Sequence, residues 1–150
     1  MKKEEILLLE NQLCFSIYAC SREIVRLYRP YLDELGITYP QYLVLLVLWE
    51  HETCSVNELG ELLFLDSGTL TPMLKRMETA GLLIRKRAIE DERKVLITLT
   101  QTGLELKEKA FCIPTSLFQG TGTTEKEFLQ LLKQNKALLQ KIQKLNQGRE

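Results

Sequence analysis

The sequence predicts a mostly helical fold that carries one small β-hairpin. Three observations favour this fold class. Apolar residues recur at three- and four-residue spacing along most of the chain, which is typical of helices. Residues with N-cap chemistry, Ser55, Asp66 and Thr124, each precede such a segment. Two short segments, 82–86 and 95–99, flank a charged stretch, which indicates a hairpin.

The first helix is expected over residues 4–29. Pro30 should interrupt it, because proline lacks the backbone N–H that a helix interior needs. Gly36 and Pro40 then bracket a short connector. A second helix is expected over Gln41–Glu52. Apolar residues surround nearly all of this segment, so the helix should be buried.

Two short helices and the hairpin follow. A capping box, a serine followed three residues later by a glutamate, opens the helix Val56–Leu63. The next helix begins near Asp66 and ends at Ala80, and Gly81 suits the position just beyond its end. The hairpin then surrounds the charged stretch Arg87–Lys94.

The last third of the chain is predicted to be helical with one interruption. A helix from Thr100 to Cys112 is expected to end because of Pro114, and residues 118–124 should form a loop. A second capping box, at residues 124–127, opens a final helix. The apolar residues of that helix are Phe128, Leu131, Leu132, Leu138, Leu139, Ile142 and Leu145.

The composition argues against several classes of protein. The 150 residues suit a single domain, and 20 basic side chains balance 20 acidic ones. The zero net charge by itself argues mildly against nucleic-acid binding. Met1–Asn11 does not resemble an export signal and no apolar run could span a bilayer, so we expect a cytoplasmic protein without a membrane partner. The cysteines lack paired spacing and His51 is the sole histidine, so we expect free thiols, no metal and no cofactor; these cysteines are Cys14, Cys20, Cys54 and Cys112.

A short capped helix, a turn, a second capped helix and a hairpin form, in this order, a winged helix-turn-helix. The second helix carries hydroxyls at its start and two cations one turn later, which suits a major groove and its phosphates. Arg93 at the hairpin tip suits a narrow minor groove, and Asp91 is placed to orient that arginine by a charge-assisted hydrogen bond. The candidate DNA-binding residues are Ser67, Thr69, Thr71, Lys75, Arg76, Arg85, Lys86, Arg87, Asp91, Arg93 and Lys94. Each of them, taken singly, also fits a solvated surface.

Two segments resemble the MarR family of bacterial transcription regulators. Residues 65–78 look like the recognition helix of that family, and Asp91-Glu92-Arg93 followed by residues 99–103 resembles its wing signature. The resemblance implies a repressor that binds a pseudo-palindromic operator in double-stranded DNA as a homodimer. The implied dimerisation helices lie at about 4–35 and 124–147, with the winged helix-turn-helix at about 40–112.

Residues 9–15, with Tyr18, Tyr28 and residues 37–42, resemble the branch of that family that senses organic hydroperoxides. The resemblance implies that Cys14 is the redox-sensing thiol. It also implies that Tyr28 and Tyr39 of the second subunit hydrogen-bond this thiol, with Tyr18 close by. The residues alone favour the opposite interpretation, because a cysteine on a packed helix usually behaves as an inert small hydrophobe.

The implied mechanism is a redox switch. An organic hydroperoxide oxidises Cys14 to a sulfenic acid, the dimer repacks, and the recognition helices leave their half-site spacing. Two-cysteine members have a resolving cysteine near the position of Gln119, so we expect closure by a low-molecular-weight thiol instead. Cys112 is left unassigned, Cys20 is expected to pack, and Cys54 should lie in a polar turn without a role.

Three other functions compete with this hypothesis. The first is a MarR-type repressor that is released by a small aromatic or phenolic ligand, with the tyrosines lining its pocket. The second is a thiol peroxidase that uses Cys14, although no threonine and arginine constellation accompanies this cysteine. The third is a winged helix that binds proteins. A regulator that is not an enzyme is the preferred hypothesis.

Overall fold

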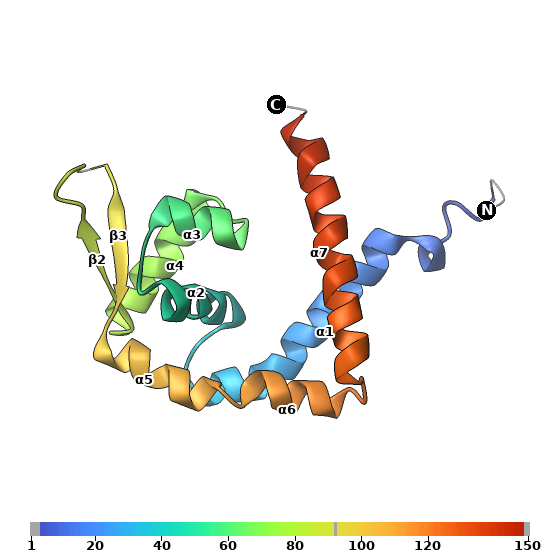
Figure 1. Ribbon diagram of the computed structural model, residues 1–150, viewed down its shortest axis with the longest axis horizontal. Coiled ribbons are helices and arrows are strands. Elements are labelled where there is room, and N and C mark those ends of the chain that lie inside the picture. The colour runs from blue at the N-terminus through green and yellow to red at the C-terminus, as the bar shows by residue number, and fades with distance from the viewer. Residues whose placement is uncertain (1–3, 92, 149–150) are drawn as a thin grey trace. The chain divides into compact units, whose positions relative to one another are not determined.

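The computed structural model describes residues 4–91 and 93–148. The chain divides into two compact units, which lie within residues 1–113 and 114–150 and are described separately. Figure 1 shows the chain coloured from the N-terminus to the C-terminus, with most of its helices and strands labelled. The fold is mostly helical with a small antiparallel sheet, as the sequence predicts.

The first helix differs from the prediction at both ends. A 3-10 turn, η1 (Leu9–Asn11), precedes α1 (Leu13–Glu34). The prediction that Pro30 interrupts this helix is wrong, because α1 continues through it for another turn. Proline removes one backbone donor, and the burial of Leu32 in the last turn of α1 favours continuation of the helix beyond it. The helix ends at Glu34, and Gly36, two residues further on, adopts a positive φ of 67°.

The second helix, α2 (Tyr39–His51), supplies much of the core. Thr38 and Gln41 form a capping box at its start, and Pro40 occupies the first turn, where no backbone donor is lost. The helix is apolar nearly all round, and Val44, Leu45 and Leu48 are fully buried in the first unit. The predicted burial of α2 holds for one face, since Leu46 on another face is 40% exposed in the single chain.

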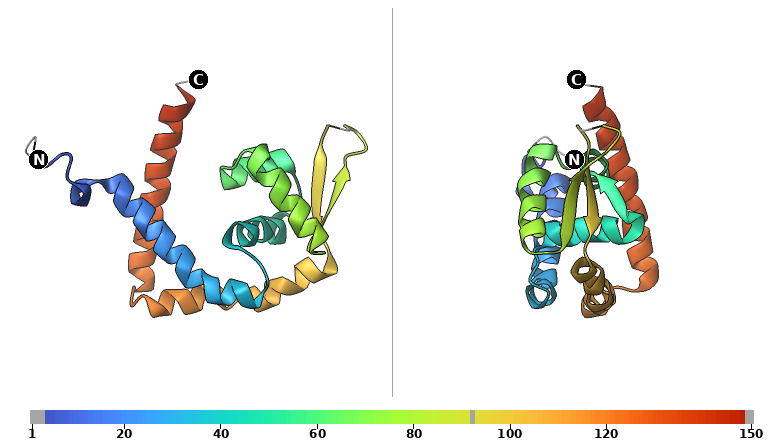
Figure 2. Two further views of the ribbon diagram at one scale, coloured as in Figure 1. Left: turned by 180° about the vertical axis from the view of Figure 1, so that it is seen from behind. Right: turned by 90° about the vertical axis from the view of Figure 1, so that its left-hand side faces the viewer.

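The helix-turn-helix consists of α3 (Val56–Leu63) and α4 (Ser67–Thr79). The capping box predicted at the start of α3 is present, and Asp66 caps α4 by accepting a hydrogen bond from the Thr69 N–H. Phe64 ends α3 in the left-handed region, at a φ of 56°. Gly81, at φ 73°, follows the end of α4 as predicted. Figure 2 shows α4 running alongside the sheet.

The sheet has three strands in the order β1-β3-β2, namely β1 (Thr53–Ser55), β2 (Leu83–Arg87) and β3 (Val95–Leu99). The hairpin of β2 and β3 confirms the predicted wing. The short strand β1 corrects the expectation that Cys54 lies in a polar turn. Cys54 pairs with Ile97 across β1 and β3 and is 4% exposed, because its side chain faces the core.

The helix predicted for residues 100–112 is found at residues 101–110, and a second helix follows it. The first, α5 (Gln101–Ala110), is capped by Thr100 and belongs to the first unit. The second, α6 (Ile113–Gly120), begins where the sequence predicts a stop, because Pro114 lies in its first turn and proline is tolerated there. The loop expected over residues 118–124 is therefore shorter and starts after Gly120.

The second unit contains α7 (Glu125–Gln147), which starts at the predicted capping box of Thr124 and Glu127. No residue of α7 is buried in the single chain, although the helix carries many large apolar side chains. None of the described helices combines the length and the apolar character that crossing a membrane requires.

Candidate nucleic-acid interface and thiol site

The helix α4 has one buried face and one exposed polar face. Leu70, Leu74 and Met77 are fully buried, and they fix the helix on the core. Ser67, Thr69, Lys75 and Arg76 lie on the exposed face, and Thr71 is partly exposed. The Thr69 hydroxyl donates to Asp66 Oδ2 at 2.8 Å, so this predicted site residue also supports the cap. The helix thus presents hydroxyls and cations to solvent, as an element that enters a major groove requires.

The cations of the wing differ in their exposure and in their ion pairs. Lys86, Arg87, Arg93 and Lys94 are exposed, and among the described residues none lies within ion-pair distance of a carboxylate. Arg85 differs, because Glu78 binds it at three points. The Glu78 carboxylate accepts the Arg85 backbone N–H at 3.0 Å and Nε at 2.9 Å, and it lies 2.9 Å from Nη2.

The hydrogen bonds from the Arg85 backbone and side chain hold the pKa of Glu78 below its usual range. The carboxylate therefore stays charged at neutral pH and offsets the charge of Arg85. The role of Glu78 is not evident from the sequence, because Glu78 and Arg85 lie seven positions apart on either side of a turn and no periodicity links them.

Asp91 orients the wing tip in a way that differs from the prediction. Its carboxylate accepts the backbone N–H of Arg93 at 3.0 Å and forms no ion pair with that guanidinium in the described structure. A carboxylate two residues before an N–H closes a short turn, which satisfies the backbone and leaves the side chain free. Further bonds, from Ala88 N–H to the Lys94 carbonyl and from Lys94 N–H to the Asp91 carbonyl, hold the tip in shape.

Cys14 lies exposed in the first turn of α1. Tyr18 is exposed one turn later, with the Arg22 guanidinium 5.5 Å from its ring centroid. Tyr28 and Tyr39, which the sequence analysis assigns to the same site, do contact each other. Their ring centroids are 5.0 Å apart in an edge-to-face arrangement.

Tyr42 completes an aromatic cluster with these two tyrosines. Its ring centroid lies 5.7 Å from that of Tyr28 and 6.3 Å from that of Tyr39. Burial and the neighbouring phenols raise the pKa of Tyr28 to about 12, and burial raises the pKa of Tyr39 and Tyr42 as well. All three phenols therefore remain protonated at neutral pH and can donate hydrogen bonds.

Cys14 and Tyr28 do not meet within one chain. Fourteen positions separate them on α1, which corresponds to about 21 Å along a helix axis. The same spacing at about 100° per residue returns Tyr28 to within about 40° of the face that carries Cys14. The thiol and the tyrosine cluster thus share a face and lie two thirds of the helix apart.

The other cysteines occupy different environments. Cys20 and Cys112 are exposed, whereas burial and the charge of Glu58 raise the pKa of the Cys54 thiol. Among the described residues, no three histidine, cysteine or acidic side chains gather as metal ligands would.

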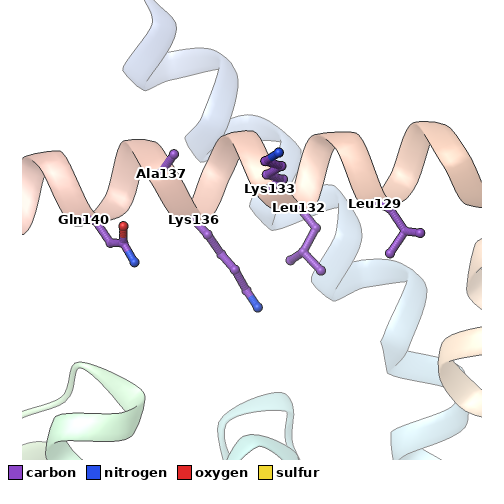
Figure 3. Close-up of a pocket in the computed structure, with 6 residues that line it drawn as sticks. All are labelled: Leu129, Leu132, Lys133, Lys136, Ala137 and Gln140. Carbon is purple, nitrogen blue, oxygen red and sulfur yellow. The ribbon is translucent and has the colours of Figure 1, made fainter.

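In the second unit, α7 has a hollow of about 380 Å³ along one face. Figure 3 shows its lining, which combines leucines with the long stems of two lysines. The six lining residues are Leu129, Leu132, Lys133, Lys136, Ala137 and Gln140. Apolar side chains are not confined to this hollow, because Phe128, Leu131 and Leu139 are exposed as well. A helix with this much uncovered apolar surface needs a partner.

A known protein family matches the part of the chain that contains the helix-turn-helix, the wing and α5. Residues 26–110, more than half of the chain, match the model of the SarA/Rot transcriptional regulators. The chain belongs to the SarA/Rot family of transcriptional regulators. Over 138 residues it is 56% identical to the organic hydroperoxide resistance transcriptional regulator of Bacillus subtilis, and the match covers 92% of this chain and 94% of that protein.

Solved structures place this SarA/Rot-family chain among the MarR-type winged helices. Reduced AbfR bound to DNA, from Staphylococcus epidermidis, shares 40% identity with a TM-score of 0.78, covering 95% of this chain and 99% of that one. The reduced form of MarR from E. coli shares 30% identity with a TM-score of 0.72, covering 85% and 96%. The family expected from residues 65–78 and 91–103 is thereby confirmed.

Proposed function

We propose that this regulator binds an operator in double-stranded DNA as a homodimer and releases it when an organic hydroperoxide oxidises Cys14. It would act as a repressor in the bacterial cytoplasm, where its operator lies. The resemblance to a hydroperoxide resistance regulator at 56% identity supports the oxidant class. The arrangement of Cys14 and the tyrosine cluster carries the proposal for the site.

The DNA contacts follow from the exposed side chains of α4 and the wing. Ser67, Thr69 and Thr71 would meet phosphates and base edges at the start of α4, and Lys75 and Arg76 would hold the backbone. In the wing, Lys86, Arg87 and Lys94 would flank the groove and Arg93 would enter it, with Asp91 fixing the tip. Two copies related by a twofold axis would meet two half-sites of a pseudo-palindrome.

The separation of Cys14 from the tyrosine cluster supports a site shared between subunits. Thiol and phenols lie on one face of α1 but about 21 Å apart. An antiparallel second α1 would bring Cys14 of one subunit to Tyr28 and Tyr39 of the other, and would do so twice by symmetry. Uncovered apolar side chains on α1 and α7, Ile17 and Leu139 among them, supply the surface that such a dimer buries.

The chemistry begins at the sulfur of Cys14. The thiolate attacks one peroxide oxygen, the O–O bond breaks, and the alkoxide leaves and takes a proton to become an alcohol. Cys14 becomes a sulfenic acid as the peroxide is reduced by two electrons. A low-molecular-weight thiol then attacks that sulfur, which forms a mixed disulfide and releases water. Tyr28 and Tyr39 would lose their hydrogen-bond acceptor in this step, and the shared site would repack.

A titration of operator DNA tests this function. Reduced protein, protein treated with cumene hydroperoxide, and treated protein followed by dithiothreitol are compared at one salt concentration. We expect tight binding that peroxide abolishes and dithiothreitol restores. Cys14→Ser should bind DNA and ignore peroxide, whereas Cys20→Ser, on the same helix, should respond as the wild type does. Release of Cys14→Ser by peroxide would exclude Cys14 as the sensor.

A second candidate function has one observation in its favour. A groove of about 440 Å³ between α1 and α2 combines apolar residues with Arg26, Arg29 and Asp33, and Arg29 lies 3.7 Å from Asp33. Its lining includes Val25, Arg26, Arg29, Ile37, Tyr39 and Pro40. A small aromatic or phenolic ligand suits this combination. Operator release by such a ligand under reducing conditions, with Cys14→Ser equally responsive, would favour this ligand-controlled repressor.

A further inference from the structure

We propose that Trp49 is a positioning residue that transmits the state of the tyrosine cluster to the end of the recognition helix α4. The inference rests on the proposed function, since it assigns the route by which oxidation at Cys14 would reach the DNA-binding elements. It follows from one continuous series of contacts within the first unit, from Tyr28 to Gly81.

The series begins in the aromatic cluster. Tyr28 and Tyr39 both contact Tyr42, which is only 2% exposed and therefore has little room to move independently. Tyr42 in turn contacts Trp49, with ring centroids 6.2 Å apart and an interplanar angle of 70°. Tyr42 and Trp49 are seven residues apart on α2, so they occupy the same side of one rigid helix.

The series continues through a hydrogen bond between helices. The Trp49 indole donates from Nε1 to the Gly103 carbonyl of α5 at 2.9 Å. This contact links residues 54 positions apart in the chain and is partly buried, where a hydrogen bond is strengthened. Lys107 of α5 adds a second link by donating to the Trp49 carbonyl at 3.3 Å.

The start of α5 is joined directly to the end of α4. The Gly103 N–H donates to the Thr100 hydroxyl at 3.1 Å, and that hydroxyl donates to the Gly81 carbonyl at 2.6 Å. The Thr100 N–H donates to the Leu82 carbonyl at 3.1 Å. A Cβ on Gly103 would collide with the same carbonyl, so no gap is available to absorb a shift.

Gly81 and Leu82 connect the recognition helix to the wing. They lie between the C-cap of α4 at Ala80 and the start of β2 at Leu83. A displacement of Tyr28 or Tyr39 is therefore passed by packed rings and hydrogen bonds to the hinge of both DNA-contacting elements. The coupling acts through the two ends of α2, with tyrosines at one end and Trp49 near the other.

The chain offers a built-in probe for this route, because Trp49 is its sole tryptophan. We expect the indole emission to change when cumene hydroperoxide oxidises the wild-type protein, and to stay unchanged in Cys14→Ser. The emission should recover with dithiothreitol over the same range in which operator binding recovers. Wild-type protein that releases its operator on oxidation with no change in Trp49 emission would overturn the proposal.

A variant tests the same route by function. Trp49→Phe keeps an aromatic ring beside Tyr42 and removes the Nε1 donor to Gly103. We expect the reduced variant to bind its operator within a few-fold of the wild type, and the peroxide-induced loss of affinity to fall about tenfold or more, within the usual range of allosteric coupling. Tyr31→Phe, which removes a phenol of α1 outside the series, is the matched control and should release as the wild type does.

The outcomes separate this proposal from the proposed function. Peroxide release of Cys14→Ser would contradict the function itself. Release that depends on Cys14 but is undiminished in Trp49→Phe would leave the function standing and overturn the route. If Trp49→Phe fails to bind DNA when reduced, the emission measurement on the wild type decides the question by itself.

Discussion

At the scale of single residues, the tyrosine cluster combines two properties that a thiol sensor needs. Its ring centroids lie 5.0 to 6.3 Å apart, with Tyr28 and Tyr39 edge to face and Tyr42 tilted against both, so the three rings restrict one another's positions. Burial keeps them protonated, so Tyr28 and Tyr39 remain donors throughout the pH range of a cell. Oxidation of a thiolate to a sulfenic acid or a disulfide changes the hydrogen-bond acceptor that these phenols can bind.

The raised pKa of Tyr28 predicts a loss of stability at high pH. The pKa is about 12 in the folded chain, against 10.0 for an unperturbed tyrosine. The folded state therefore holds a proton that the unfolded state releases, so the contribution is complete below pH 10 and is lost as pH rises toward 12. Tyr28 is only partly buried and solvent screens part of the effect, so we expect a loss of roughly 1 kcal/mol. Urea unfolding across this range should show a shallower decline for Tyr28→Phe, and an identical decline would contradict the prediction.

At the scale of elements, the Glu78–Arg85 pair joins the recognition helix to the wing. One carboxylate binds both the backbone and the guanidinium of β2 from the last turn of α4. Because Arg85 is engaged in this way, its effect on DNA binding would be to hold the wing at a fixed angle to α4. The free cations Lys86 and Arg87, which follow it in β2, are the ones available to phosphates.

Removal of Glu78 distinguishes the two roles of Arg85. If Arg85 positions the wing, Glu78→Ala should weaken operator binding by about tenfold, the size of one charge-assisted hydrogen bond. If Arg85 instead contacts phosphate, the loss of a negative charge beside it should tighten binding. Anisotropy titrations at fixed salt measure the difference. Glu78→Gln, which keeps an acceptor for the Arg85 N–H, is the matched control and should lie between Glu78→Ala and the wild type.

The sequence predicts those elements whose signals are local. The capping boxes at Ser55 and Thr124, the C-terminal Gly81 and the hairpin are determined by residues within a few positions, and they are found where expected. Pro30 misled the prediction because its effect on α1 is decided by the burial of a distant surface. The strand β1 exists only because β3 pairs with it, and three residues carry no period.

In the candidate site too, features set by neighbouring residues were predictable, whereas contacts between distant residues were not. The exposed residues of α4 and the wing were predictable from helix spacing and charge, and the importance of Cys14 from resemblance. Tyr42 was predictable as core but not as a neighbour of Trp49 and Tyr28, since ring contacts depend on how α1 and α2 pack. The Trp49 bond to Gly103 spans 54 positions and leaves no trace in local sequence.

At the scale of the whole molecule, a zero net charge conceals a local excess of cations. Several acidic side chains are occupied within the protein by caps, as Asp66 and Glu58 are, or by Arg85, as Glu78 is. The exposed cations of the DNA-contacting elements remain available. They are Lys75, Arg76, Lys86, Arg87, Arg93 and Lys94.

This distribution predicts a steep salt dependence of operator binding. Each phosphate contact contributes about 0.9 to the slope of log affinity against log salt. Lys75→Ala changes both subunits of a homodimer, so we expect the slope to fall by about 1.8. Arg85→Ala should weaken binding at an unchanged slope. Lys126→Ala, on α7 and outside the helix-turn-helix and wing, is the control and should change neither quantity. A slope near zero for the wild type would contradict phosphate binding through these residues.

The strand order β1-β3-β2 has a consequence for self-association. Because β3 is the central strand, β2 is an edge strand whose outer backbone groups have no strand partner. Such edges are the places where β-sheets of two molecules can pair and aggregate. Glu78 occupies the outward N–H of Arg85 on that edge, and Lys86 and Arg87 place like charges along it. The β2 strand of a second molecule could therefore not accept the Arg85 N–H, and its cations would be repelled by those of the first. The protein can thus expose apolar helix faces that are available for dimerisation, while the edge of its sheet disfavours association between sheets.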